Sequence, residues 1–341
     1  MQFLGSTAFA LAKEKDMCAI AGLLFKHNVK RNFAMTTGQA LTEILDATLH
    51  RGPDSAGWAL YREPLKDLYR MRFLLPESPG APHGMKKNER LEGASENSST
   101  AYEIKTIRQE LEALDVTIVK EWVEGCTLAI HAAYDGDILT LTRSIEKKLT
   151  PISMGSRLDI LKDVGVPRDL DKKYDISSFN GSHGVAHIRL ATESGVHPDT
   201  AHPFWACGFA DIATVHNGQI TNYWIMRRRL ERKGMTFQTE NDTELIAVYL
   251  AYHMSQKASL ENALKASLDD LDGTFSYLVA TKDAIGYAKD KLAAKPMVKY
   301  ENDEMIAISS EEVGLNRLFP GQALETSEPA PFTYGLWTRN N

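Results

Sequence analysis

The stretch Met17-Cys18-Ala19-Ile20-Ala21-Gly22 opens the first apolar run that predicts core structure, and it places a cysteine directly after a methionine. Residues 18–25 predict a short buried strand, because they are apolar and end at polar residues 26–28. If Met17 is an initiator that is removed, Cys18 carries a free α-amine beside its thiol. An α-amine titrates at roughly 7.7–8.0, so Cys18 would supply both a nucleophile and its base.

The segment before this cysteine, residues 1–17, lacks the order of a secretion signal. Its apolar part, residues 3–12, is short, no Lys or Arg precedes it, and the charged residues 13–16 follow it. We expect residues 1–17 to be a misassigned start or a removable propeptide, with translation from Met17 as the first expectation and cleavage as the second. If the chain instead starts at Met1, the Cys18 amine is part of a peptide bond and the base is missing.

The composition is that of an ordinary globular protein. The 341 residues are 43% hydrophobic, which allows a large buried core. A formal charge of −6 argues against nucleic acid or an anionic membrane as the main partner, and no apolar run approaches the ~20 residues of a membrane span. Cys18, Cys126 and Cys207 are widely spaced and form no CxxC pair, so we expect no disulfide framework, no metal site and a cytoplasmic location.

The first two thirds of the chain give an incomplete pattern. Residues 37–49 predict a helix that Thr36 or Thr37 caps, and residues 50–57 predict a turn-rich loop. Residues of about 76–155 are expected to form an insertion. Around and within it we predict a helix in 102–125, a strand over 126–142 and a short helix over 156–165.

From residue 184 onward the pattern is sharper. Strands are expected over residues 185–190, 209–215, 274–281, 284–288, 296–300 and 304–309. Helices are expected over residues 222–233, 242–254 and 259–268. The order lacks regular βαβ alternation, so the pattern predicts a layered α+β fold.

Polar residues recur where apolar strands end, which is where a rigid scaffold presents a site. Arg189, in HIRLAT (187–192), needs an anion, and its planar fork suits a carboxylate; a structural ion pair, for example with Glu193, is the alternative. The amide of Asn217 and the N–H of Gly218 can both donate to one oxygen, as an oxyanion hole requires. The alternative is a plain Asn-Gly hairpin turn.

Two further polar stretches complete the set. Asp242, in NDTE (241–244), can receive an ammonium group, although capping of the following helix would also explain an aspartate. Arg51 opens a loop in which pairing with Asp54 is the structural alternative. Cys18 taken alone would be a small residue in a buried strand. Together the stretches indicate a site for an α-amino acid, with a thiol nucleophile, an oxyanion hole and a charge for each end of the substrate.

With these stretches the chain resembles the class II glutamine amidotransferases, which are N-terminal-nucleophile (Ntn) hydrolases. The matching motifs are MCAIAG, HRGPDSAG, HIRLAT, HNG, NDTE and LDDLDGTFSYLVATKD. They occur in the family's order over 18–341, and an ordered set is far more specific than any one motif. The resemblance implies one domain over 18–341 with a four-layer αββα sandwich of antiparallel sheets.

The resemblance also implies roles for individual residues. Cys18 would attack the side-chain amide of L-glutamine, and Asn217 and Gly218 would stabilise the oxyanion. Arg189 would bind the substrate carboxylate and Asp242 its amine. The residues expected to line or flank the pocket are Thr192, His202 and Arg51. The products would be glutamate and ammonia, with no metal involved.

Several segments of the sequence also resemble a narrower group, the GlxB-like amidotransferase subunits of glutamate-synthase-like and N-methylglutamate synthase complexes. The segments AHIRLATES, AHPFW, KGMTFQTENDTELIAVYL and MGSRLDILKDVGVP carry this likeness. It implies that ammonia passes to glutamate-synthase-like partner subunits, which would hold the FMN and the iron–sulfur centre, with no cofactor on this chain. A free-standing glutaminase or other Ntn amidohydrolase stays open, as does a non-catalytic glutamine-binding subunit if the N-terminus is unprocessed.

Overall fold

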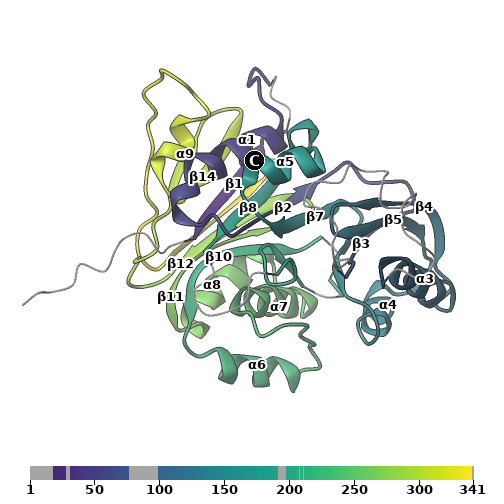
Figure 1. Ribbon diagram of the computed structural model, residues 1–341. Coiled ribbons are helices and arrows are strands. Elements are labelled where there is room, and N and C mark those ends of the chain that lie inside the picture. Colours follow the sequence, from purple (N-terminus) through teal and green to yellow (C-terminus); the bar gives the residue numbers. More distant parts are fainter. Residues whose placement is uncertain are drawn as a thin grey trace, which may run out of the picture.

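The computed structural model describes residues 18–27, 31–76, 99–190, 197–206, 208–209 and 211–339. Two antiparallel sheets lie face to face, and helices cover the outer face of each (Figure 1). The first sheet has the order β13 (Val298–Glu301), β14 (Met305–Ser309), β1 (Ala19–Phe25), β8 (His183–Arg189), β2 (Ser55–Tyr61) and β7 (Leu158–Val164). The second has the order β15 (Thr333–Thr338), β12 (Ala284–Lys289), β11 (Gly273–Ala280), β10 (Ala213–Ile220) and β9 (Phe204–Trp205).

The alternation of side chains along β1 explains the layering. Ile20 and Leu24 pack in the cluster that also holds Val215 and Leu278 of the second sheet. Leu23, pointing the other way, belongs to the cluster with the helices on the outer face of the first sheet. Both faces of the strand are therefore buried, as the continuous apolar run predicts.

Six helices complete the outer layers. Those on the first sheet are α1 (Thr37–Ala47), α5 (Pro167–Tyr174) and α9 (Glu312–Asn316), with the short 3₁₀ turns η1 (Leu49–Arg51) and η2 (Ile176–Ser178) beside them. Those on the second are α6 (Tyr223–Glu231), α7 (Asp242–Ser255) and α8 (Leu260–Asp270). The arrangement confirms the expected four-layer αββα sandwich. None of the helices in the described part of the chain combines the length and apolarity needed to cross a bilayer.

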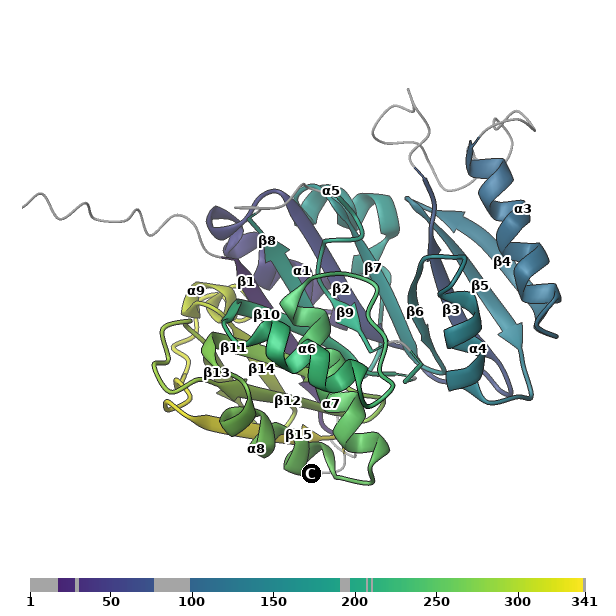
Figure 2. The ribbon, with the colours of Figure 1, turned by 90° about the horizontal axis from the view of Figure 1, so that it is seen from below.

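The middle of the chain forms a third sheet to one side of the sandwich (Figure 2). Its order is β4 (Thr117–Glu124), β5 (Thr127–Ala133), β3 (Tyr69–Leu74) and β6 (Pro151–Gly155). The helices α3 (Ser99–Glu112) and α4 (Ile138–Ile145) belong to this part of the chain. The predicted insertion of about 76–155 includes most of these elements, and its residues 77–98 lie outside the described ones.

Two predicted boundaries in this region are wrong. The helix expected within 102–125 ends at Glu112, because Asp115 adopts a left-handed turn with φ of 59° and the β-branched residues after it form β4. The strand expected over 126–142 ends at Ala133, because Asp137 caps a new helix by accepting a hydrogen bond from the N–H of Thr140 at 2.8 Å.

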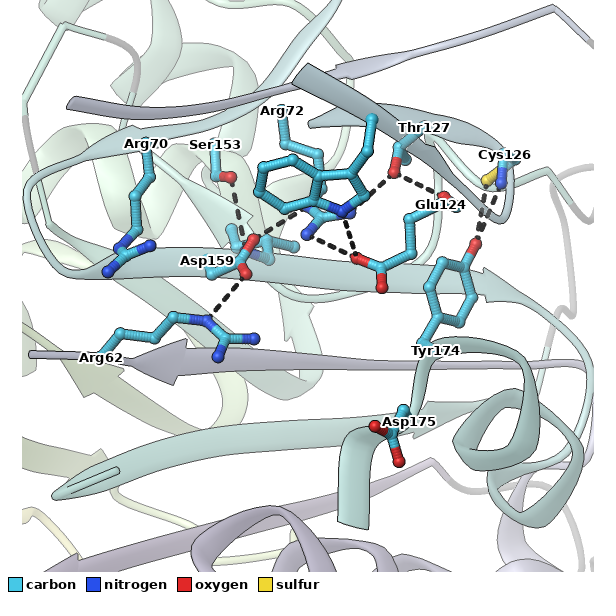
Figure 3. A network of polar contacts seen from close by, with 12 residues as sticks. Arg62, Arg70, Arg72, Glu124, Cys126, Thr127, Ser153, Asp159, Tyr174 and Asp175 are labelled. Atoms are coloured by element: carbon cyan, nitrogen blue, oxygen red, sulfur yellow. Dashed lines mark hydrogen bonds and ion pairs between the residues drawn. The ribbon is translucent and has the colours of Figure 1, made fainter. Parts of the chain in front are cut away.

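The short helix expected over 156–165 is also wrong, since Leu158–Val164 is strand β7 and pairs with β2. Asp159 of this strand is buried. The Nε of Arg72 donates to Asp159 at 2.8 Å, and another guanidinium nitrogen of Arg72 donates to Glu124 at 3.0 Å (Figure 3). A strand can bury charges only when such partners are present, and these partners come from the third sheet.

Candidate active site

The sheet register places the Cys18 thiol beside the end of β8. Ala19 lies opposite Ile188, so Cys18 comes opposite Arg189. The Leu190 N–H donates to the Cys18 sulfur at 3.4 Å, and the thiol faces the Leu190 carbonyl at 3.9 Å. Burial raises the pKa of the thiol, although the Leu190 N–H and the Arg189 charge act in the opposite direction. At neutral pH the sulfur is therefore protonated and needs a base before it can attack.

The carbonyl of Cys18 is held from two sides. The Nδ2 of Asn217 donates to it at 3.0 Å, and the Nε of Arg51 donates at 3.1 Å. Arg51 is buried and forms an ion pair with Glu311 rather than with Asp54. The predicted neighbours Asn217 and Arg51 thus both meet the residue that carries the thiol.

Asn217 and Gly218 lie inside strand β10, opposite Ser276 and Phe275, and not at a hairpin turn. Gly218 has φ of 133°, a conformation that other residues rarely adopt. A Cβ at this position would come within 1.9 Å of the Thr274 carbonyl oxygen. The chain therefore requires glycine beside the Asn217 amide, where its N–H can serve as a second donor.

A buried histidine fixes which way the Asn217 amide points. The Nε2 of His187 lies 3.2 Å from both the Asn217 Oδ1 and the His216 carbonyl, which are acceptors, so Nε2 carries the proton. Burial lowers the pKa of His187 to about 3, which keeps the ring neutral. With its oxygen held by His187, Asn217 turns its NH₂ group toward Cys18.

Arg189 lies at the end of β8 and is 8% exposed. One of its terminal nitrogens donates to the Thr200 hydroxyl at 3.1 Å. The alternative partner Glu193 and the predicted pocket residue Thr192 lie outside the described residues. The Arg189 charge is close enough to act on the Cys18 thiol, and the Thr200 hydroxyl is one of the groups that hold the guanidinium.

Asp242 is the first residue of α7, and Asn241 rather than Asp242 caps the helix through the Thr243 N–H at 2.9 Å. The Asp242 carboxylate accepts the Ile220 N–H at 3.1 Å and lies 3.4 Å from the Nδ1 of His216. Burial acts to raise its pKa, but His216 and these hydrogen bonds outweigh it and lower the pKa below its usual range. Asp242 therefore carries a negative charge at neutral pH, against the last residue of β10.

His202, predicted at the pocket, stacks on His187 with ring centroids 4.0 Å apart. Its Nε2 lies 3.4 Å from the Thr243 hydroxyl, and burial together with the neighbouring His187 lowers its pKa well below the usual value. The His202 ring therefore does not contact Asn217 directly, because His187 lies between them. It packs against His187 and Phe204, so it acts on Asn217 only through His187.

The sequence reasoning missed three residues that hold this arrangement: Ser310, Glu311 and Thr200. The Ser310 hydroxyl accepts the Ile20 N–H at 2.9 Å and the Asn217 Nδ2 at 3.1 Å. Ser310 and Glu311 directly follow the apolar strand β14, so the rule that polar residues at strand ends mark a site could have found them. Thr200 carries no such signal, because it lies in a loop.

This geometry defines a class of protein. Cys18 stands at the start of a central strand of an αββα sandwich, beside an amide donor and a guanidinium, and an ionised carboxylate lies at the end of the strand that carries the amide donor. A substrate with an α-carboxylate, an α-amine and a side-chain amide matches these groups, and that combination describes the class II glutamine amidotransferases of the Ntn-hydrolase fold.

Comparison with known proteins identifies the family. The model of the glutamine amidotransferase domain matches residues 187–317. The chain is 33% identical to the glutamine amidotransferase-like protein GlxB of Rhizobium meliloti strain 1021 over 331 residues, 94% of this chain and 98% of that one. A second relative, from Methanothermobacter thermautotrophicus, is 34% identical over 315 residues, 92% of this chain and 97% of its own. The chain therefore belongs to the glutamine amidotransferase family and is an enzyme of class II.

A solved structure agrees on the fold. The glutamine phosphoribosylpyrophosphate amidotransferase from B. subtilis, complexed with ADP and GMP, superposes with a TM-score of 0.55 at 16% identity. The match covers 95% of this chain and 49% of that one, so this chain spans about half of that enzyme. At this identity the likeness concerns the fold alone.

Proposed function

We propose that the protein hydrolyses L-glutamine to glutamate and ammonia with Cys18 as an N-terminal nucleophile. The free α-amine of Cys18 takes the thiol proton, and the sulfur attacks the side-chain amide carbon. The tetrahedral intermediate collapses as the amide nitrogen accepts a proton and leaves as ammonia. Water then attacks the resulting thioester, which releases glutamate and restores the thiol.

The remaining groups bind the oxyanion and the two charged groups of the substrate. The Asn217 amide and the Gly218 N–H donate to the oxyanion, and removal of one such donor typically costs 10²- to 10³-fold in kcat. Arg189 binds the α-carboxylate, and Asp242 binds the α-ammonium group. One observation carries this proposal. The Nδ2 of Asn217 lies 3.0 Å from the carbonyl oxygen of Cys18, so the proposed oxyanion donor and the proposed nucleophile are neighbours.

The test is Cys18→Ala in protein that starts at residue 18. We expect turnover of glutamine to disappear while thermal unfolding changes little, because the sulfur accepts only the long 3.4 Å contact from the Leu190 N–H and the β1–β8 pairing begins at Ala19. Matched Cys126→Ala protein should keep its turnover, since the buried Cys126 contacts the Tyr174 hydroxyl at 3.4 Å and the main-chain carbonyl of Lys162 at 3.8 Å, and neither group is assigned to the substrate. Glutamine hydrolysis by Cys18→Ala protein would refute the assignment.

We further propose that the ammonia passes to a glutamate-synthase-like partner subunit. The likeness to GlxB over nearly the full length of both chains supports this step. The flavin and the iron–sulfur centre would belong to the partner, and this chain would bind neither. Purified alone, the protein should be a weak glutaminase whose rate rises when a purified glutamate-synthase-like subunit of the same organism is added.

Two outcomes would favour other functions. An unchanged hydrolysis rate and separate elution of the two proteins in size-exclusion chromatography would favour a free-standing glutaminase. Saturable glutamine binding without hydrolysis, in protein whose intact mass still includes residues 1–17, would favour a non-catalytic glutamine-binding subunit. Stoichiometric flavin on this chain, seen in its visible absorbance, would overturn the assignment of the cofactor to the partner.

A further inference from the structure

Lys162, on strand β7, is 4% exposed although it carries an ammonium group. Its Nζ donates to three backbone carbonyls, those of Asp199 at 3.2 Å, Ala201 at 2.8 Å and Pro203 at 3.3 Å. It also lies 4.5 Å from the centroid of the Phe204 ring. The ammonium thus has as many acceptors as it has N–H groups, and all three belong to a single segment, residues 199–203.

That segment supports the candidate substrate site. Thr200 presents the hydroxyl that accepts from Arg189, and His202 stacks on the ring that orients Asn217. A loop without regular hydrogen bonds to a sheet needs another means of holding one conformation. The three contacts of Lys162 alternate along the segment with Thr200 and His202, so they fix the backbone on both sides of each.

Gly57, on the neighbouring strand β2, leaves room for residues 199–203 to pack against the strand. Gly57 lies opposite Lys162 in the β2–β7 pairing. A Cβ at Gly57 would come within 2.1 Å of the His202 carbonyl oxygen and 2.6 Å of the Lys162 Cβ. The segment therefore lies directly on the β2 backbone, and Gly57 and Lys162 hold it from two sides.

Burial lowers the pKa of Lys162 to about 8, because the charged form loses hydration at this position. An apolar residue would avoid this cost but would leave the carbonyls of Asp199, Ala201 and Pro203 without this donor. The three carbonyl contacts point to a requirement on the conformation of residues 199–203.

We propose that Lys162 is a positioning residue for substrate recognition: it fixes residues 199–203 so that Thr200 holds the Arg189 guanidinium in the orientation that binds the α-carboxylate of glutamine. This inference rests on the proposed role of Arg189. It gives a function to the segment MGSRLDILKDVGVP, which contains Lys162, and to Gly57 of HRGPDSAG.

The experiment compares two substrates in protein that starts at Cys18. One is L-glutamine, and the other is the amide of γ-aminobutyrate, which is glutamine without its α-carboxylate. For Lys162→Met we expect the KM for glutamine to rise about 10-fold or more, as for the loss of a charge-assisted hydrogen bond, with a smaller fall in kcat because His202 is also held by this segment. The kcat/KM for the carboxylate-free substrate should fall only by that smaller factor.

Three variants make the result specific. Thr200→Val should raise the KM for glutamine as Lys162→Met does, and the double variant should be no worse than either one, because both changes act through Arg189. Lys172→Met is the matched control, since this exposed lysine pairs only weakly with Asp169 at 3.5 Å. Thr200→Val also tests the proposal if Lys162→Met protein does not fold.

Equal losses on both substrates, or no loss on glutamine, would overturn the positioning role and leave Lys162 as a structural residue. The proposed function fails in a different way. If the unmodified enzyme does not prefer glutamine to the carboxylate-free amide, Arg189 does not bind the carboxylate, whatever Lys162 does.

Discussion

The donors proposed for the oxyanion depend on two residues with opposite requirements. Asn217 needs a particular side-chain orientation, which the proton on His187 Nε2 provides at 3.2 Å from its oxygen. Gly218 needs the absence of a side chain, because its backbone has φ of 133° and runs against the Thr274 carbonyl. The requirement at Asn217 concerns hydrogen bonding, and the requirement at Gly218 concerns space. Substitutions at the two positions should therefore have different effects.

Gly218→Ala tests the steric requirement. We expect it to lower the free energy of unfolding by more than about 1–3 kcal/mol, the usual cost of a non-glycine residue in a strained conformation, because the new Cβ also meets Thr274. Gly234→Ala is the matched control, since Gly234 has φ of 83° but no neighbouring atom within 4 Å of the added Cβ. Urea unfolding of both variants measures the difference. Equal losses would contradict the clash with Thr274.

At the scale of elements, patterns that repeat locally are predictable from the sequence. Strand β1 follows from its continuous apolar run, and helix α7 begins at Asp242 as expected because a cap and an acidic first turn precede an apolar stretch. Strand β7 is not predictable in this way. Asp159 and Lys162 have partners at Arg72 and in 199–203, far away in the sequence, and only those partners allow a strand to bury them.

The same distinction applies to the site. Cys18, Arg189 and Asn217 occur in motifs whose residue types already suggest chemistry, and the structure brings them together. Ser310 accepts a main-chain N–H as well as the Asn217 amide, and Lys162 donates to three main-chain carbonyls. Every residue except proline has both groups on its backbone, so no sequence pattern marks which of them a side chain will meet.

Strand β8 carries two buried histidines that make stability depend on pH. Burial lowers the pKa of His183 and of His187 from 6.5 to about 3. Below pH 6.5 the unfolded chain takes up a proton at each, while the folded chain stays neutral until about pH 3. Stability is therefore complete above pH 6.5 and falls as the pH drops, by about 1.4 kcal/mol per pH unit for each histidine.

Urea unfolding at about pH 7 and pH 5 measures this loss, which should be about 2 kcal/mol for each histidine. His183→Gln protein provides the comparison, since glutamine can contact Ser182 and the Thr281 carbonyl but does not titrate. Between the two pH values, the free energy of unfolding of the variant should fall by about 2 kcal/mol less than that of the unmodified protein. An equal loss in both proteins would show that His183 is not the titrating group.

For the whole molecule, the position of Cys18 connects the fold to the reaction. It directly precedes β1, which lies inside the six-stranded sheet between β14 and β8. A nucleophile at this position is held by strands on both sides, and its carbonyl is fixed by Asn217 and Arg51. The nitrogen of Cys18 belongs to the same fixed residue, and it can act as a base only when no residue is attached to it.

This gives a prediction for two preparations of the protein, one starting at Cys18 and one carrying residues 1–17. Because burial raises the pKa of the thiol, the attached form has a protonated sulfur and no amine to accept its proton. General-base catalysis is typically worth 10²- to 10⁴-fold, so we expect glutamine hydrolysis to fall by at least about 100-fold in the longer form.

Intact-mass measurement before and after the assay must show that the longer form keeps its residues. Alkylation of Cys18 at high pH, where the thiol ionises without a base, separates a missing base from a blocked thiol: similar rates in the two forms indicate the former. Equal glutamine hydrolysis by the two forms, with residues 1–17 still attached, would show that another group takes the thiol proton. In that case Cys18 would remain the nucleophile of the proposal, but the α-amine would lose its role.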